Sequence, residues 1–220
     1  MTSPLSTRRP PPLLTGVGLA GGAIGLLVLG GLLLDRWPLA FDRAMMLWIR
    51  GLGGAPALRH AARDVTALGG GTVLTLVVLL AAGLLTALRH HFTALMLVAA
   101  AWSGSLAVSW LKSFVGRPRP ALVEHWAYVD NASFPSGHAA SSAVIYLTLA
   151  ALASQVVRER AARTYMLGGA IMLAGLIGVS RVYLGVHWPS DVLAGWSFGT
   201  LWALGWWRAT AWARASLRQS

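Results

Sequence analysis

The sequence predicts an all-α, polytopic membrane protein with six transmembrane helices and short interfacial helices between the first and second spans. Of its 220 residues, 56% are hydrophobic and only 11% are charged, whereas about 25% are charged in a typical soluble domain. Uncharged apolar runs long enough to cross a hydrocarbon core of about 30 Å recur along the chain. Several of the segments between these runs are short and rich in arginine.

Net charge and cysteine content narrow the class further. The formal net charge of +11 would suggest nucleic-acid binding in a soluble protein. Here the basic residues flank apolar runs, so we expect them to face anionic lipid headgroups of the bilayer and not nucleic acid. The chain contains no cysteine, which excludes disulfides and thiolate metal sites.

The first 64 residues divide into a tail, a span and an interfacial segment. Residues 1–12 carry two arginines and a run of prolines, and we expect a disordered basic tail. Residues 13–34 are uncharged and form the first expected span, because no small-residue cleavage site follows to indicate a signal peptide. In residues 35–64 apolar side chains recur at helical intervals, which predicts short interfacial helices with Asp42 as an N-cap and a break near Gly53–Gly54.

Five more spans are expected, separated by a basic turn at 89–91, a polar loop at 116–134 and a basic loop at 158–163. The six spans would make one membrane domain over residues 13–210, followed by a basic tail over 211–220. Four tryptophans near the end of the last span are typical of an aromatic belt at the membrane surface. The expected spans after the first are residues 65–88, 92–111, 137–157, 164–180 and 191–207.

Six spans place both chain ends on the same side of the membrane, together with the basic segments 89–91 and 158–163. Because arginine is enriched in all four, the positive-inside rule predicts that this side is cytoplasmic. The opposite side is then periplasmic or extracellular, and the expected location is a bacterial cytoplasmic (inner) membrane.

Three polar stretches fall on that opposite side. Lys112–Pro120 (KSFVGRPRP) ends the third span, Pro135–His138 (PSGH) opens the fourth, and Ser180–Asp191 (SRVYLGVHWPSD) joins the fifth to the sixth. Charged side chains beside hydrocarbon are costly, about 2.5–3.5 kcal/mol for Arg or Asp at a bilayer centre, and therefore usually serve a function. We expect the three stretches to meet in one site.

Several residues in these stretches suit a phosphate group. Lys112, Arg119 and Arg181 are cations with few acidic residues near them in the sequence, and arginine presents a fork that matches phosphate oxygens. Ser136 and Gly137 stand where the fourth span begins, and the N–H groups and dipole of a helix start favour an anion. Ser136 is also a candidate N-cap.

A histidine and an aspartate in the third stretch suggest catalysis. His187 and Asp191 are four residues apart and share a face of a helix that starts near Pro189. An aspartate bonded to one ring nitrogen fixes the histidine tautomer and leaves the other nitrogen free to attack. The structural alternative is a buried pair that only stabilises the helix start. With His138 facing the same site, the simplest chemistry is phosphoryl transfer, in which one imidazole attacks phosphorus and the other protonates the leaving oxygen.

Together the three stretches resemble the signature motifs of the type 2 phosphatidic acid phosphatase (PAP2) superfamily, K-x6-RP, PSGH and SR-x5-H-x3-D. Every motif position is present, and the spacing selects Arg119 over Arg117. The resemblance covers roughly residues 65–207. It implies that His187 is the nucleophile and forms a phosphohistidine, that Asp191 orients it, and that His138 is the general acid and later activates water.

The same resemblance implies the rest of the site and the substrate class. Lys112, Arg119, Ser136, Gly137 and Arg181 would bind the phosphoryl oxygens, without a metal or another cofactor. The sequence offers no clustered carboxylates of the kind that bind Mg²⁺. The implied substrate is a membrane lipid phosphomonoester or diphosphate, with undecaprenyl diphosphate favoured and phosphatidylglycerophosphate or phosphatidic acid as alternatives.

Two other functions stay open at this point, a lipid phosphotransferase with the same site and a non-catalytic lipid transporter or binding protein on the same scaffold. The haloperoxidases of the superfamily fit less well, because six spans suggest a lipid-facing site. The oligomeric state is not indicated. Outside the motifs, we expect His125, Glu124 and Asp130 to be solvated loop residues, with contact to lipid headgroups as the alternative. His60 and Arg63 are expected to be solvated residues of the interfacial segment, with lipid gating as the alternative. Tyr183 is expected to pack.

Overall fold

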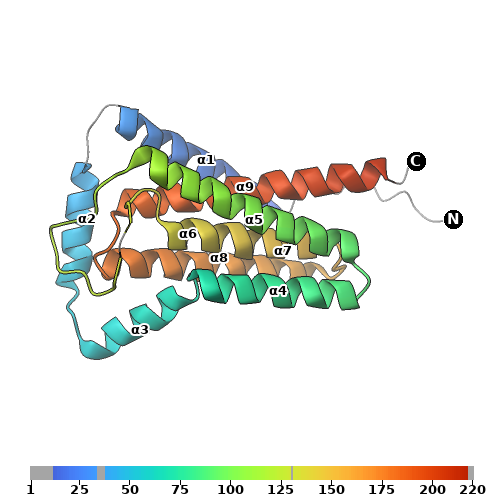
Figure 1. Ribbon diagram of the computed structural model, residues 1–220, viewed down its shortest axis with the longest axis horizontal. Coiled ribbons are helices and arrows are strands. Elements are labelled where there is room, and N and C mark those ends of the chain that lie inside the picture. Colours follow the sequence, from blue (N-terminus) through green and yellow to red (C-terminus); the bar gives the residue numbers. More distant parts are fainter. Residues whose placement is uncertain (1–11, 34–37, 130, 218–220) are drawn as a thin grey trace.

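The computed structural model describes residues 12–33, 38–129 and 131–217, and within them the secondary structure is entirely helical. The all-α expectation is therefore confirmed for the described part of the chain. The long helices lie side by side along one direction (Figure 1). The elements are α1 (Pro12–Leu33), α2 (Ala40–Gly51), α3 (Pro56–Ala67), α4 (Gly71–Ala87), α5 (His91–Val115), α6 (Gly137–Ser142), the π-helical η1 (Ala143–Leu147), α7 (Thr148–Ala153), α8 (Arg160–Tyr183) and α9 (Pro189–Ser216).

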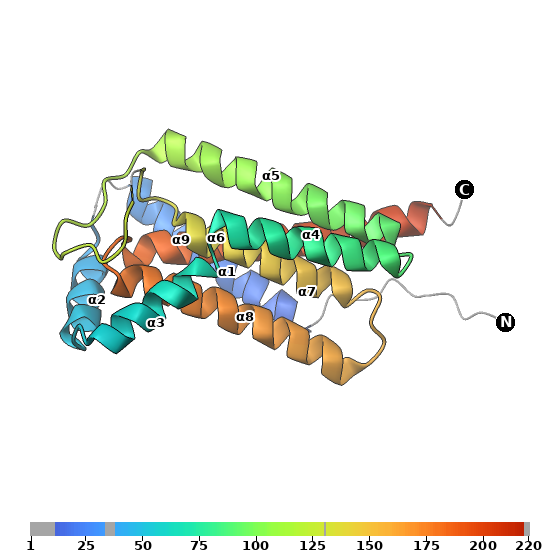
Figure 2. The ribbon, with the colours of Figure 1, turned by 60° about the horizontal axis from the view of Figure 1, so that its bottom comes forward.

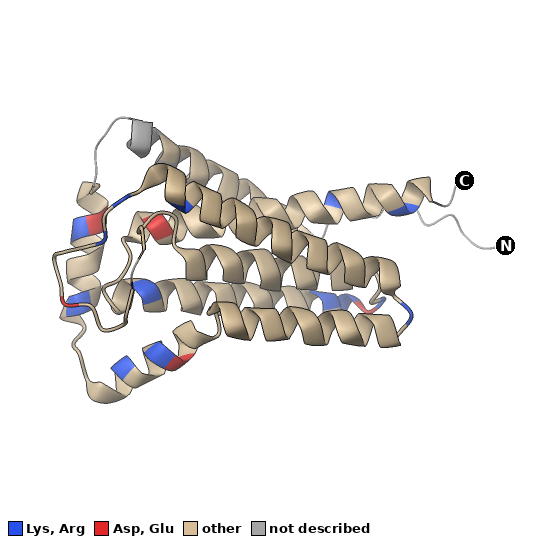
Figure 3. Cartoon of the chain, viewed as in Figure 1, with Lys and Arg blue, Asp and Glu red and all other residues tan. Residues whose placement is uncertain are grey.

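Two short helices differ from the rest in direction. α2 lies across one end of the bundle, and α3 runs obliquely from the turn after α2 to the start of α4 (Figures 1 and 2). The loop between α5 and α6 lies at the same end. Figure 3 shows that charged residues gather toward the two ends of the long helices, while the stretches between carry almost none. This distribution suits helices whose middle faces hydrocarbon.

Length and composition identify α5 and α8 as helices able to cross a membrane on their own, among the described residues. The pair α3 and α4 would count as a third crossing if the two are taken as one span bent by 47°. The apolar stretches 14–26 and 137–153 are shorter. α9 has 28 residues but does not meet the same criterion, since its tryptophans, its acidic start and Arg208 lower its mean hydropathy.

The helix boundaries differ from the expected spans at several points. α5 runs past Lys112 to Val115 and ends at Gly116, whose positive φ of 60° stops the helix. Residues 65–67 belong to α3 and not to the second span, because the chain bends at Gly69–Gly71 before α4 begins. α9 continues to Ser216 and includes most of the expected C-terminal tail. Residues 1–11 and 218–220 lie outside the described residues.

The short helices expected in residues 35–64 are present as α2 and α3, and they separate where glycine was expected to break the helix. Gly53 has φ of +94°, in the region that favours glycine. Asp42 is not the N-cap of α2. Leu39 occupies that position, and Asp42 is the third helical residue, with its carboxylate accepting the Leu39 N–H at 3.3 Å. The spacing of apolar residues alone does not distinguish these two positions.

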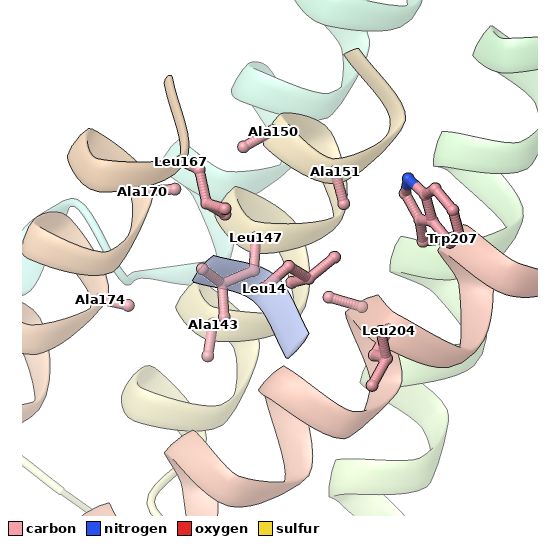
Figure 4. Close-up of a cluster of buried hydrophobic side chains, with 11 residues drawn as sticks. Leu14, Ala143, Leu147, Ala150, Ala151, Leu167, Ala170, Ala174, Leu204 and Trp207 are labelled. Carbon is pink, nitrogen blue, oxygen red and sulfur yellow. The ribbon is translucent and has the colours of Figure 1, made fainter. Parts of the chain in front are cut away.

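The interior is packed mainly by α9. A buried cluster joins α1, η1, α7, α8 and α9 through small and branched side chains, and Figure 4 shows Leu14, Leu147 and Leu204 pointing toward one another within it. α9 also approaches α6 and η1 closely at two glycines. A Cβ added at Gly199 would lie 2.4 Å from the Ala143 Cβ, and one at Gly195 would lie 2.9 Å from the Ala140 nitrogen. This close packing fixes the start of α9 against the start of α6.

Candidate active site

The three polar stretches meet at the end of the bundle that carries α2 and α3. Lys112 lies in the last turn of α5, Ser136 caps α6, Arg181 lies in the last turn of α8, and Asp191 lies in the first turn of α9. His187 stands in the short loop between α8 and α9. Helices that run in alternate directions thus bring their polar ends together, although the three stretches are far apart in the sequence.

Direct contacts tie these ends to one another. The Ser136 N–H donates to the Asp191 carbonyl at 3.0 Å, which joins the starts of α6 and α9. A Cβ placed on Gly137 would lie 3.2 Å from the Cε of Lys112, so α5 and α6 also touch here. His138 is within electrostatic reach of His187 and of the three expected cations, Arg181, Lys112 and Arg119. All eight expected site residues therefore lie in one place.

His187 and Asp191 form the expected pair. His187 is 1% exposed and Asp191 is fully buried, and the His187 Nδ1 lies 3.4 Å from the Asp191 Oδ2. The same Oδ2 accepts the Trp188 N–H at 2.9 Å and the Ser133 hydroxyl. At the other side of the ring, the His187 Nε2 lies 3.2 Å from Nη1 of Arg119. Since that arginine only donates, the network assigns the proton to Nδ1 and leaves a lone pair on Nε2.

The surroundings keep this imidazole neutral. Burial lowers the pKa of His187 to about 4, and the positive charges of Arg181 and Arg119 act in the same direction. Asp191 opposes the shift through its hydrogen bond and its charge. The ring is therefore unprotonated at Nε2 over the physiological pH range, which is the state that a nucleophile requires.

Two of the cations are linked by a loop residue. Lys112 Nζ donates to the Ala132 carbonyl at 2.7 Å and to the Asn131 Oδ1 at 3.3 Å. Arg119 reaches the same Asn131 side chain through Nη2 at 2.9 Å and the Val186 carbonyl through Nη1 at 2.6 Å. Asn131 was not expected from the sequence. It ties Lys112 to Arg119, the arginine that lies beside the His187 Nε2.

The third cation is buried deeper. Arg181 is 4% exposed and donates from Nη1 to the Thr66 hydroxyl of α3 at 3.2 Å. Its Nε and the Ser136 hydroxyl are both buried without a hydrogen-bond partner among the described residues. Buried polar groups of this kind are costly unless a partner is supplied. Phosphoryl oxygens would supply partners to both groups.

Sequence reasoning missed a second layer of polar residues behind Asp191. Arg117 is 5% exposed and bonds Asp191 through Nη1 and Asp42 through Nη2. Ser190 joins the same group, and Ser133 bonds Asp191 from the loop before α6. The available signal was Arg117 itself, which lies in the GRPRP segment but falls outside the motif spacing. Nothing in the sequence indicated that Asp42, from α2, would reach it.

The other titratable residues singled out from the sequence serve the surrounding loops. The His125 Nε2 lies 2.7 Å from the Pro120 carbonyl, and Arg63 donates to the Trp126 carbonyl at 2.9 Å. Tyr183 is buried and donates to the Gly53 carbonyl, so it packs the α2–α3 turn. His60 is exposed on α3, and Asp130 lies outside the described residues. In the described part of the chain, no three His, Asp or Glu side chains converge as metal ligands would.

Comparisons with known proteins place this arrangement in context. A family model described as the PAP2 superfamily matches residues 92–215. Phosphatidylglycerophosphatase B of Bacillus subtilis is 32% identical over 150 residues, which cover 66% of this chain and 72% of the relative. An undecaprenyl-diphosphatase of Sulfolobus acidocaldarius is 41% identical over 68 residues, covering 31% of this chain and 29% of that protein.

A solved structure extends the likeness to the whole fold. The crystal structure of a transmembrane PAP2-type phosphatidylglycerolphosphate phosphatase from Bacillus subtilis matches with a TM-score of 0.76 and 25% identity. The match covers 84% of this chain and 93% of that structure.

Proposed function

Since the chain belongs to the PAP2 superfamily of membrane lipid phosphatases, we propose that it removes the terminal phosphate of a membrane lipid through a phosphohistidine on His187. The hydrolase class and the multi-pass membrane fold follow from the family. The residue roles, the substrate and the orientation belong to the proposal. One observation carries the roles: the lone pair on the His187 Nε2 faces Arg119, while its Nδ1 faces a buried aspartate.

In the first step, the His187 Nε2 attacks phosphorus, and the bond from phosphorus to the lipid oxygen breaks as the N–P bond forms. His138, protonated when the anionic phosphate of the substrate occupies the site, donates that proton to the departing oxygen. Lys112, Arg119 and Arg181 stabilise the charge on the phosphoryl oxygens, together with the Ser136 hydroxyl and the N–H groups at the start of α6. Asp191 stabilises the positive charge that the phosphorylated imidazole acquires.

In the second step, His138 accepts a proton from water, and the water oxygen attacks phosphorus. The N–P bond breaks, inorganic phosphate leaves, and His187 returns to the neutral form. No step requires a metal ion or cofactor. An alcohol or phosphate acceptor in place of water would give phosphotransfer with the same intermediate.

Two lipids are the leading substrate candidates. The phosphatidylglycerophosphatase is matched over 72% of its length, whereas the undecaprenyl-diphosphatase is matched over 29%. The wider match favours phosphatidylglycerophosphate as the first substrate to test. Undecaprenyl diphosphate, which the sequence favoured, is the second, because a relative of that activity is 41% identical over 68 residues.

We further propose six spans, α1, α4, α5, the continuous helix α6–α7, α8 and α9, with the site at the outer surface. Arg89 precedes the start of α5 and Arg160 begins α8, so both stand at the helix ends remote from Lys112 and Arg181. Basic residues at that end of the bundle support a cytoplasmic location for it and for both chain ends. The chain has no native cysteine, so single-cysteine variants test this cleanly. In intact cells an impermeant maleimide should label Tyr128→Cys and not Glu159→Cys, and the reverse pattern would overturn the orientation.

The function itself is tested with purified protein and three lipids, phosphatidylglycerophosphate, undecaprenyl diphosphate and phosphatidic acid. We expect phosphate release from at least one, and loss of release in His187→Ala with His60→Ala unaffected. With ³²P in the terminal phosphate, an alkaline quench should trap label on the wild-type protein and not on His187→Ala. Folded wild-type protein that releases no phosphate from any of the three lipids would contradict the proposal.

A further inference from the structure

A buried charge network connects α2 to the site from behind. The Arg117 guanidinium lies between two aspartates that are both fully buried, Asp42 and Asp191. Its Nη2 donates to the Asp42 Oδ2 at 2.9 Å, and its Nη1 donates to the Asp191 Oδ1 and to the Ser190 hydroxyl, the latter at 2.9 Å. The guanidinium carbon also lies 5.3 Å from the centre of the Trp188 ring.

Asp42 and Asp191 hold equivalent positions in their helices. Each is the third helical residue, and each accepts the N–H of its own N-cap residue, Leu39 or Trp188. Asp42 additionally accepts the Ser190 N–H at 2.8 Å and the Ser190 hydroxyl at 2.7 Å. The start of α2 is therefore bonded directly to the first turn of α9, which carries Asp191.

We propose that Arg117 and Asp42 are positioning residues, which hold the Asp191 carboxylate ionised and directed at the His187 Nδ1. This inference rests on the proposed phosphohistidine chemistry. Arg117 donates to the Asp191 Oδ1, while Oδ2 accepts the Ser133 hydroxyl and the Trp188 N–H and lies beside His187. Held at both oxygens, the carboxylate cannot rotate away from the ring.

Asp42 has an electrostatic role that Arg117 alone would not fill. An arginine paired only with Asp191 would neutralise it, and little charge would remain to stabilise a phosphorylated imidazole. With Asp42 on the other side of the guanidinium, the three groups carry a formal net charge of −1. That charge matches the positive charge that His187 acquires in the first step. In a buried setting such a balance acts strongly, because the surroundings screen it weakly.

A purely structural role would predict a different pattern. Buried ion pairs are weak contributors to stability compared with apolar side chains of similar volume. Arg117 bonds Asp191, which lies at the Nδ1 side of the His187 ring, whereas Arg119 stands at the Nε2 side, where substrate would bind. We therefore expect changes at Arg117 to act on turnover and not on substrate affinity.

The test uses Asp42→Asn and Arg117→Gln, each in the wild-type and the Asp191→Asn background. We expect kcat to fall about 10- to 100-fold with KM within about threefold, the usual size of effect when a supporting residue is removed. In the Asp191→Asn background either change should cost less than about threefold, because the partner it supports is already lost. Exposed residues of α3 and α2 supply the matched controls, Asp64→Asn and Arg43→Gln, which should stay within about twofold of wild type.

Two outcomes would overturn the proposal. One is an equal loss of kcat in both backgrounds, which would indicate a structural role. The other is a raised KM with unchanged kcat, which would indicate contact with substrate. If Arg117→Gln fails to fold, Ser190→Ala removes the hydroxyl that joins Arg117 to Asp42 and should show a smaller loss with the same dependence on Asp191.

A spectroscopic measurement separates this inference from the proposed function. In protein labelled with ¹⁵N-histidine, the His187 signals are identified by their loss in His187→Asn. We expect one tautomer, protonated at Nδ1, in the wild type and a mixture of tautomers in Asp42→Asn. An unchanged tautomer in both Asp42→Asn and Arg117→Gln would overturn the inference. Absence of turnover by the wild type would instead overturn the proposed function, and it would leave this measurement valid.

Discussion

At Gly195, α9 packs closely against the start of α6, and Gly195→Ala should reduce both turnover and stability. A Cβ at this position would lie 2.9 Å from the Ala140 nitrogen, 3.0 Å from the Ser136 carbonyl oxygen and 3.1 Å from the Ala139 Cβ. Ordinary contact begins near 3.4 Å, so the helices must separate by about 0.5 Å. Two of these atoms are backbone and cannot rotate away.

The expected magnitudes follow from that displacement. Overpacking a tight interface costs about 1–3 kcal/mol, and replacing glycine by alanine inside a helix returns about 1 kcal/mol. The net loss of up to about 2 kcal/mol should lower Tm by several degrees, at roughly 2–4 °C per kcal/mol for a chain of this size. The same separation lengthens the bond from the Ser136 N–H to the Asp191 carbonyl. A misplacement of about 1 Å can cost about 100-fold in rate, so we expect about a tenfold fall in kcat.

Gly205→Ala is the matched control on the same helix, since no atom lies within 4 Å of a Cβ at Gly205. It should leave kcat unchanged and raise Tm slightly through helix propensity. The assay is thermal unfolding in one detergent, together with phosphate release under saturating lipid. A Gly195→Ala protein with wild-type kcat and a Tm equal to that of Gly205→Ala would refute the reasoning.

Three further predictions concern the site. His138→Gln should slow hydrolysis of phosphatidic acid, whose leaving group is an alkoxide, at least tenfold more than hydrolysis of undecaprenyl diphosphate, whose leaving group is a phosphate; equal losses in parallel assays would argue against a general acid. The pKa of His187 falls from 6.5 to about 4 on folding, so between these values the unfolded chain binds more protons than the folded one. The contribution of His187 to the free energy of unfolding should therefore rise with pH across that window. The Tm difference between wild type and His187→Asn should therefore grow from pH 4 to 6.5 and then level off, and a difference that is flat with pH would contradict the assignment. Thr66→Val removes the hydroxyl bonded to Arg181 and should raise KM about threefold to tenfold with little change in kcat; an unchanged KM would mean that Thr66 does not position Arg181.

Much of the fold could be predicted from the sequence, because hydropathy and a few breakers determine where helices form in such a chain. The break at Gly53–Gly54 and the short helices around it follow from glycine and from the spacing of apolar residues. The bend between α3 and α4 was missed, since Gly69–Gly71 lies inside an otherwise apolar run. The extension of α5 past Lys112 was also missed, because a charged residue at the end of an apolar run suggests that the span ends there. The helix instead continues to Val115 and is stopped by Gly116.

Motif spacing and residue chemistry could identify the residues expected at the site, and these residues lie together in the structure. The layer behind them could not be predicted in the same way. Asp42 and Asp191 are separated by 149 positions in the sequence, and only the packing of α2 against the start of α9 brings them to one guanidinium. Local patterns report which face of a helix is apolar, and they carry little information about which polar groups of two distant helices meet.

The π-helical segment η1 begins five residues after His138, where α6 ends. A π turn takes in an extra residue, and each residue of an α-helix accounts for about 100° of rotation. The half after η1 is therefore rotated about the helix axis relative to the half before it. The half farther from the site packs Leu147, Ala150 and Ala151 against α1, α8 and α9. The half nearer the site presents Ser136 and His138 to the ends of α5, α8 and α9. In an uninterrupted α-helix, one rotation about the axis would fix both the packing face and the direction of the His138 imidazole. The π turn allows the two to be set separately.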